Sequence, residues 1–307
     1  LKYGHTTQQI DVGIAVFRRL FSQKGLERFF DRLRSDFEFD RALEGHYLTT
    51  IDPVISFLSE EGVVTAGEII VPGFLPEGPR FSTLSQNSDI VGGMDVHEKG
   101  LYYASLYIDD LSDLMNQTVI PGFGLSKYQE SLGQSARSFD EMYAVLQERG
   151  SDLVAELTSE VLNERLTNVP ALIAITVPFP GNLYGALVTA LWAKERYPEV
   201  PIVLGGGFVN SELRSLSDSR IFEAINYLCF DDGERPLLQI IESLNEGATP
   251  QLLRTMVCES GEVVLKSTEG VSDLHVNSVG TPDYAAVDFT QYISLYESAN
   301  PMHTLWS

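Results

Sequence analysis

Three short apolar runs in the second half of the chain alternate with segments of helical periodicity. The runs are ALIAITV (171–177), PIVLGGG (201–207) and AINYLCF (224–230). Helical spacing of apolar residues follows them at about 183–197, from about 211, and at about 234–245. Continuous apolar runs of this length are typical of strands buried on both faces, and their alternation with helices is typical of a parallel sheet. We therefore predict an α/β domain over residues 166–250, with helices covering both faces of its sheet.

The first 165 residues are predicted to form a mainly helical region. Within it, a helix is expected to begin with Asp52 as its cap and Pro53 as its first residue, and to end at Gly62. The stretch VVTAGEIIVPGFLPEGPRF (63–81) indicates a change towards strand, and helical patterns return over about 100–168, where Ser138 and Glu141 have the spacing of a capping box. Before all of these, apolar residues spaced by three and four form one stripe: Ile10, Ile14, Phe17, Phe21, Leu26, Phe29, Phe30 and Leu33.

Residues 251–307 make up the third predicted part of the chain. The stretch LLRTMVCESGEVVLKS (252–267) predicts a hairpin that turns at Ser260 and Gly261. The pattern then becomes irregular up to Ser307, so we expect a hairpin followed by a linker.

The net charge of the chain limits the classes of molecule that it is expected to bind. The 43 Asp and Glu residues against 21 Lys and Arg give a formal net charge of −22 over 307 residues. A surface this acidic repels phosphate backbones and anionic lipid headgroups, so we expect no nucleic acid and no membrane among the partners. No run of 18 apolar residues and no secretory leader pattern is present, which favours a cytoplasmic location. A small molecule or another protein remains as partner.

Each predicted strand ends in a loop that carries little side chain at its tip: PFPGN (178–182), GGGF (205–208) and DDGERP (231–236). The carboxyl ends of parallel strands meet at one edge of a sheet, where ligands of such folds bind. The candidate cofactor-binding residues are Pro178, Phe179, Pro180, Gly181, Asn182, Leu183, Gly205, Gly206, Gly207, Phe208, Asp231, Asp232, Gly233 and Glu234.

A purely structural role is an alternative for each loop. The prolines stop a strand, Asn182 or one of the aspartates Asp231 and Asp232 can cap the next helix, and glycines form tight turns. The alternatives stay open at the level of sequence. No G-x-G-x-x-G, G-x-x-x-x-G-K-[ST] or G-x-S-x-G motif is present, so dinucleotide, P-loop and α/β-hydrolase functions lose their main support.

Four stretches resemble one family: ITVPFPGNLYGAL (175–187), IVLGGGFVNSELRSLSD (202–218), YLCFDDGERPLLQII (227–241) and GTPDYAAVDFTQY (280–292). In this order they resemble the cobalamin-binding half of B12-dependent radical SAM proteins, over about residues 165–295. FLPEGPRF (74–81) and SLYIDDLSDLM (105–115) resemble, more loosely, the extra helical region of one branch of that family. The resemblance implies a Rossmann-like sheet of the cobalamin-binding type behind a mainly helical N-terminal region.

The resemblance also implies cofactors that this chain does not hold alone. Radical SAM chemistry needs three clustered cysteines for a [4Fe-4S] cluster that leaves one iron open for S-adenosylmethionine. The chain has only Cys229 and Cys258, so we expect it to be the N-terminal part of a longer enzyme whose radical SAM barrel follows Ser307. Cobalamin would serve there as methyl carrier or as a partner in radical chemistry. The alternative is a degenerate, ligand-free module that docks the barrel or a partner protein.

Two further motifs are candidate metal sites. DVHEKG (95–100) matches D-x-H-x-x-G, by which some cobalamin proteins offer a histidine to cobalt, and would make His97 the ligand. It lies too far ahead of Pro178 for that family and follows a poor strand, so a chance match is the favoured interpretation. Asp109, Asp110 and Asp113 could suggest a metal site, but a solvated acidic helix face is favoured. We predict no catalytic residue and no metal ligand in this chain.

Overall fold

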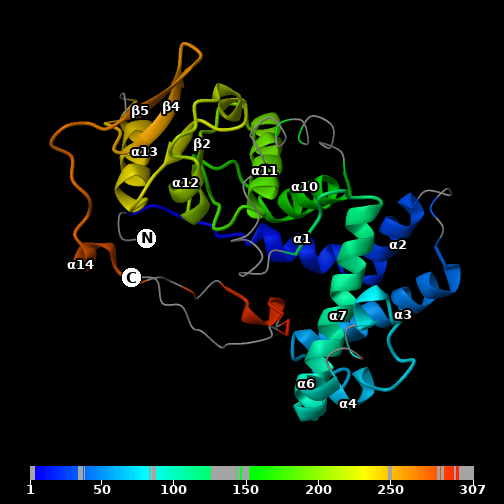
Figure 1. Cartoon of the computed structure of the whole chain (residues 1–307). Coiled ribbons are helices and arrows are strands. Elements are labelled where there is room, and N and C mark those ends of the chain that lie inside the picture. The colour runs from blue at the N-terminus through cyan, green and yellow to red at the C-terminus, as the bar shows by residue number, and fades with distance from the viewer. Residues whose placement is uncertain are drawn as a thin grey trace. The chain divides into compact units, whose positions relative to one another are not determined.

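The structure is a computed structural model that describes residues 4–33, 37, 39–82, 84, 88–125, 143, 146, 152–247, 251–281, 284, 287–293 and 295–296. The chain forms two compact units. Unit 1 comprises Leu1–Gly13 and Ser126–Ala286, and unit 2 comprises Ile14–Leu125 and Val287–Ser307. Over the described residues, unit 1 is built on a sheet and unit 2 from helices (Figure 1). The predicted capping box at Ser138 and Glu141 lies outside the described residues.

The apolar stripe near the start of the chain forms two helices, α1 (Val12–Leu20) and α2 (Gln23–Arg32). The hydroxyl of Ser22 caps α2 by accepting a hydrogen bond from the backbone N–H of Gly25. Most of the stripe is buried, with Leu26 and Phe29 fully enclosed. The stripe is therefore packing surface, as its spacing predicts.

The prediction of a helix start at Asp52 is wrong. Helix α3 (Arg41–Leu58) begins after Asp40, whose carboxylate accepts the N–H of Ala42, and Pro53 lies inside it. Burial of one side of α3 outweighs the hydrogen bond that a proline removes from a helix interior. Asp52 instead caps a different helix, because its carboxylate accepts the backbone N–H of Gln23 at a distance of 3.0 Å.

The stretch 63–81 holds helical turns where the sequence indicated a strand, so that prediction is wrong too. Thr65 and Glu68 form a reciprocal capping box that starts α4 (Ala66–Ile69), and a 3-10 helix, η1 (Pro79–Phe81), follows a turn. The capping residues satisfy the first N–H groups of α4 locally. This favours a helix over the strand that the following β-branched residues indicate. Helices α6 (Ser88–Gly93) and α7 (Val96–Gln117) come next.

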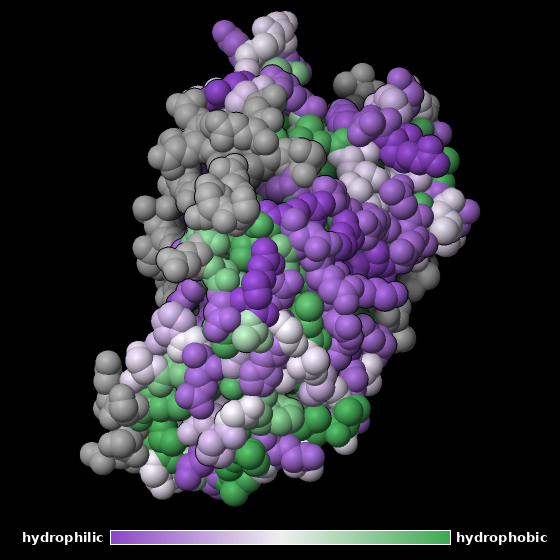
Figure 2. Space-filling model, turned by 90° about the vertical axis from the view of Figure 1, so that its right-hand side faces the viewer, coloured by the Kyte–Doolittle hydropathy of each residue, from purple (hydrophilic) through white to green (hydrophobic). Residues whose placement is uncertain are grey.

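Helix α7 forms the centre of unit 2. Its Tyr107 is fully buried, and the hydroxyl lies 3.1 Å from the hydroxyl of Thr50 and donates to the carbonyl of Tyr47. A segment far along the chain also contacts α7. After the 3-10 helix η3 (Phe289–Gln291), the N–H of Tyr296 donates to the hydroxyl of Ser105 at 2.7 Å. On the face shown in Figure 2, polar residues cover most of the middle and hydrophobic groups lie among them towards the lower end.

Unit 1 confirms the predicted α/β class. After α10 (Leu153–Arg165) come β1 (Ile173–Thr176), α11 (Asn182–Arg196), β2 (Ile202–Gly205), α12 (Gly207–Glu212), the 3-10 helix η2 (Ser219–Glu223), β3 (Tyr227–Cys229) and α13 (Glu234–Glu246). The chain then forms β4 (Thr255–Glu259), β5 (Glu262–Lys266) and α14 (Val276–Val279). The described strands lie in the order β1-β2-β3-β4-β5.

The sheet is mixed: β1, β2 and β3 are parallel, whereas β4 pairs antiparallel to both neighbours. This arrangement is compatible with a Rossmann-like fold. The predicted hairpin is confirmed, because β4 and β5 are joined at Ser260 and Gly261, both with positive φ (53° and 85°). Two successive positive φ values are what a two-residue hairpin turn needs.

Helices cover the two faces of the sheet unequally. Helices α10 and α11 lie on one side of the strands and α13 on the other (Figure 1). The first side holds the larger apolar cluster, which includes Ile202, Leu204 and Leu228. On the α13 side, Ile240 packs with Val203 and Cys229, but Ala174 and Thr176 of β1 are exposed. The expectation that every strand is buried on both faces is therefore wrong for β1.

Among the helices that the structure describes, none has both the length and the apolar character that crossing a bilayer requires.

Candidate functional site

Three predicted loops come together at one edge of the sheet in unit 1. The register pairs Thr176 with Gly205, and Leu204 with Leu228, so the carboxyl ends of β1, β2 and β3 are level. The loops after β1 and β2 also interlock, since the N–H of Val177 donates to the carbonyl of Gly205 at 2.8 Å. The N–H of Phe208 donates back to the carbonyl of Val177 at 3.1 Å.

The predicted cofactor-binding residues differ in exposure at this edge. Leu183 and Phe208 are 5% and 4% exposed and belong to the apolar cluster between the sheet and α11. We therefore expect these two to support the edge and the exposed residues to offer contacts to a ligand. The exposed ones are Pro178, Phe179, Gly181, Gly207, Asp231, Asp232, Gly233 and Glu234, and the half-buried ones are Pro180, Asn182, Gly205 and Gly206.

Gly206 is required by packing inside the protein. Its φ of 109° is a conformation that side chains rarely adopt, and a Cβ here would lie 2.7 Å from the carbonyl oxygen of Val177. A Cβ on Gly207 would lie 3.1 Å from the carbonyl oxygen of Pro178, whereas one on Gly205 would make an ordinary contact. The glycine run thus lets two neighbouring strand ends approach each other, and only Gly207 is exposed to a ligand.

Asn182 does not cap α11 as the sequence suggests. The residue before the helix is Gly181, which has no side chain with which to cap it, and Asn182 is the first helical residue. The side-chain oxygen of Asn182 is buried, and no donor among the described residues reaches it. A buried acceptor without a donor costs about 1–3 kcal/mol, and a ligand that donates a hydrogen bond removes that cost.

The third strand end carries a network of ion pairs. Asp231 has a positive φ of 59°, and its N–H donates to the side-chain oxygen of Asn210 at 2.6 Å. The Asp231 carboxylate pairs with the guanidinium of Arg214 and lies 3.0 Å from the Nε atom of Arg254. Arg254 also pairs with Asp273, and the hydrogen bond to Asp273 is the largest of the effects that raise the pKa of Arg254. Two arginines therefore compensate the negative charge of Asp231.

Sequence analysis missed four members of this network: Asn210, Arg214, Arg254 and Asp273. Arg214 lies four residues after Asn210, donates to its carbonyl at 3.0 Å, and lies over the ring of Phe230 at 5.2 Å. Their separation along the chain, and the positive φ of Arg254 (43°), leave no local pattern from which the network could have been found. The predicted caps Asp231 and Asp232 do not cap α13, which begins after Gly233 with no side-chain cap.

The residues of both candidate metal sites have structural explanations. Asp95 and Glu98 form a capping box at the start of α7, and a Cβ on Gly100 would lie 2.7 Å from the Cβ of Ala66 on α4. His97 is exposed on α7, with its ring 5.9 Å from that of Phe57. These two functions, capping and close helix packing, account for the aspartate and glycine of DVHEKG.

The acidic residues of α7 also have protein partners. The carboxylate of Asp113 accepts two hydrogen bonds from the side chain of Arg80, at 2.6 and 3.0 Å. The Asp110 carboxylate accepts the backbone N–H of Arg80 at 2.8 Å. The part of the chain that the structure describes contains no group of three or more potential metal ligands. Burial raises the pKa of the Cys229 thiol to about 11, and Cys258 is exposed on β4.

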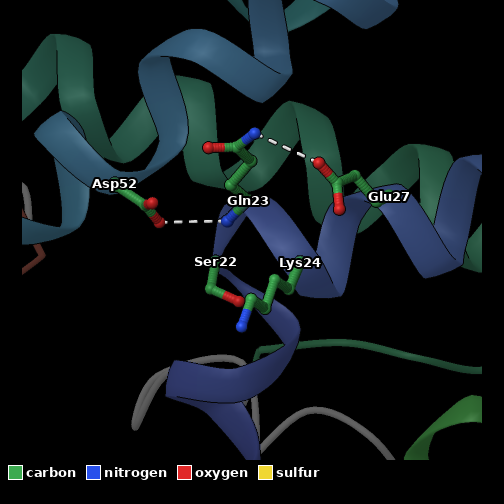
Figure 3. Close-up of a pocket in the computed structure, with 5 residues that line it drawn as sticks. All are labelled: Ser22, Gln23, Lys24, Glu27 and Asp52. Atoms are coloured by element: carbon green, nitrogen blue, oxygen red, sulfur yellow. Dashed lines mark hydrogen bonds between the residues drawn. The ribbon is translucent and has the colours of Figure 1, made fainter.

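Two cavities lie in unit 2. The larger, about 300 Å³, opens beside the start of α2 and is lined by Ser22, Gln23, Lys24, Glu27 and Asp52 (Figure 3). Its polar groups bind one another, because Asp52 accepts from the backbone of Gln23 and the side chain of Gln23 donates to Glu27 at 3.1 Å. The smaller, about 90 Å³, is lined mainly by apolar residues between positions 69 and 103.

The fold and the strand-end geometry define a chain of the α/β class with a mixed sheet and a candidate ligand site at its carboxyl edge. No family model, curated protein or solved structure matches the chain.

Proposed function

We propose that the carboxyl edge of β1–β3 binds a cobalamin. The observation that carries this proposal is the level alignment of three strand ends, which puts the exposed residues of the three loops along one rim. Corrin is a broad, flat macrocycle, so a rim with little side chain at its tips suits it. The identity of the ligand comes from the resemblance of residues 165–295 to the cobalamin-binding half of B12-dependent radical SAM proteins.

Two observations test whether the edge fits the group. The buried side-chain oxygen of Asn182 lacks a donor among the described residues, and the amide side chains of a corrin supply N–H donors. The nucleotide tail of cobalamin also needs room beside the sheet. The α11 side is filled, since Val177 and Val209 are fully buried there, whereas Ala174 and Thr176 leave the α13 side of β1 open. The tail would therefore lie against Ala174 and Thr176.

When bound, the corrin would carry a methyl group or take part in radical chemistry in a longer enzyme. The described residues do not fit a [4Fe-4S] cluster, because they include no suitable group of ligands. The cluster and S-adenosylmethionine would belong to a radical SAM domain of the same protein, for which this chain would present the corrin. The role of the chain's own residues is to bind and orient the cofactor at the rim.

The ion pairs at the third strand end favour a second candidate, a ligand-free docking module. Asp231 is already paired with Arg214 and Arg254, and neither cavity described above lies at this edge. An edge closed by its own charges suits contact with another protein surface better than entry of a large ring. The partner would be the radical SAM barrel or a separate protein.

Retention of hydroxocobalamin separates the two candidates. The protein is mixed with an excess of hydroxocobalamin and desalted, and absorbance in the visible range is read against protein concentration. Gly233 is exposed at the rim and a Cβ there meets no atom within 4 Å, so Gly233→Trp adds bulk at the rim from a position with open space around its first side-chain atom. Gly45→Trp is the matched control, since Gly45 is equally open on α3 in unit 2.

Under the cobalamin proposal, the unaltered protein and Gly45→Trp retain the cofactor, and Gly233→Trp binds it at least about tenfold more weakly, a loss of about 1.4 kcal/mol. If folded protein retains no cobalamin, the cofactor proposal fails and the docking module remains. Retention that Gly233→Trp leaves unchanged places the cofactor elsewhere.

A further inference from the structure

The smaller cavity of unit 2 is a preformed apolar socket. Its floor consists of Ile69, Leu75 and Phe81, all buried, and the ring of Phe81 meets that of Tyr103 edge to face at 6.0 Å. Val71 lies at its rim and is 52% exposed. At about 90 Å³ the socket is well below the roughly 300 Å³ at which cofactor and drug sites begin, and it matches one aliphatic side chain.

The segment that forms the wall of the socket is held at two places. Near its middle, the Nε2 atom of His46 on α3 lies 2.9 Å from the carbonyl oxygen of Phe74. At its end, Arg80 is bound twice by α7, through its backbone to Asp110 and through its side chain to Asp113. A wall fixed at both places does not have to be ordered when a ligand enters, which favours binding.

One carboxylate at the rim is left uncompensated. Glu77 lines the socket and is exposed, and among the described residues no hydrogen-bond donor or cation pairs with its side chain. The lining contains no Lys or Arg, and the nearby Arg80 is taken by Asp113. The socket therefore combines an apolar floor with a negative rim, in a chain whose net charge is −22.

We propose that this socket is a docking site for a basic peptide segment, which inserts one branched aliphatic side chain and places a Lys or Arg next to Glu77. The charge of the rim selects the occupant. A second copy of the chain would bring another strongly acidic surface, and residues 297–307 (ESANPMHTLWS) contain no Lys or Arg.

NMR spectra of the backbone amides of isotope-labelled protein test the proposal, with the capped peptide Ser-Lys-Leu-Arg-Ser as probe. The resonances of Val71 and Tyr103 should shift and saturate at peptide concentrations of about a few millimolar, as one side-chain pocket allows. Replacing the peptide's leucine by alanine should weaken binding about tenfold. The probe with Glu in place of Lys and Arg should not bind.

Two variants address the socket from the protein side. Glu77→Gln should weaken the basic probe about threefold at low salt and less at high salt, since the lost interaction is a screened surface pair. Glu60→Gln is the matched neutralisation elsewhere in unit 2, with no effect expected. Val71→Lys changes an exposed side chain, so the fold should persist while binding of the basic probe is lost.

Three results would overturn the proposal. The first is the absence of shifts at Val71 and Tyr103 up to about 5 mM probe. The second is equal binding of the acidic and basic probes. The third is self-association of the protein through Val71, which would identify a second copy as the occupant. The proposal does not depend on cobalamin binding, which the retention assay tests separately.

Discussion

Replacing Gly206 by alanine should destabilise unit 1 more than replacing either glycine beside it. The residue has φ 109° and ψ 179°, a region that only glycine populates readily, so alanine there costs about 1–3 kcal/mol in backbone strain. The new Cβ would also lie 2.7 Å from the oxygen and 2.9 Å from the nitrogen of Val177. Backbone atoms cannot rotate aside, so overpacking adds about 1–3 kcal/mol.

The combined loss is about 2–6 kcal/mol, a large share of the roughly 5–15 kcal/mol by which domains are stable. Urea unfolding followed by tryptophan fluorescence measures it, and a loss of about 3 kcal/mol lowers the midpoint by about 1 M or more. Gly205→Ala is the control, because its Cβ would meet only the carbonyl oxygen of Cys229 at 3.7 Å. If both variants unfold within about 0.5 kcal/mol of the unaltered protein, the close approach of the two strand ends is wrong.

Three further predictions concern charge and packing. Burial raises the pKa of Asp110 to about 6 from an ordinary value of 3.8, so the folded protein binds more protons than the unfolded chain between these values and stability falls as pH rises through about 4–6. This pKa shift of about two units changes the free energy of unfolding by up to about 3 kcal/mol. Asp110→Asn should therefore reduce the difference in that free energy between pH 4 and pH 7, measured by urea titration at each pH. An unchanged difference contradicts the burial of this carboxyl. Gly100→Ala should cost about 1–3 kcal/mol in thermal unfolding because it collides with Ala66, and a neutral result would remove the packing explanation of the DVHEKG glycine. Asp231→Asn should cost less than about 1 kcal/mol, since exposed ion pairs contribute little and asparagine tolerates positive φ, whereas Asp231→Val should cost about 1–2 kcal/mol more; equal losses would argue against the positive φ.

The elements that could be predicted are those whose signal is local. The three apolar runs became β1–β3, and the pair Ser260–Gly261 became a hairpin turn, because a run of apolar side chains and a two-residue turn each specify their own backbone. The start of α3 failed for the opposite reason. Asp52 and Pro53 have the form of a helix start, but α3 runs through them because tertiary burial decides the longer helix.

The candidate site was predictable only in its position. Parallel pairing places the three loops at one edge, which follows from strand–helix alternation alone. The ion pairs that hold that edge join Asp231 to Arg214, and to Arg254, which lies 23 positions later on the approach to β4. Such pairs form across the sheet through tertiary structure, and a single sequence contains no spacing that encodes them.

The packing of Gly206 changes where the support for a bound cofactor lies. A run of three glycines first suggests room for a flat ligand, but one of them is fully explained by the approach of Val177. A Cβ on Gly207 would also be close to backbone, 3.1 Å from the carbonyl oxygen of Pro178. The remaining support comes from two features with no internal explanation: the exposed Gly233, and the buried oxygen of Asn182 that lacks a donor among the described residues. A ligand that donates a hydrogen bond to Asn182 and covers Gly233 would explain both. Asn182→Ala should lower cobalamin retention by about tenfold if a corrin amide donates to Asn182, because the variant removes the acceptor, and unchanged retention would show that this oxygen does not contact the cofactor.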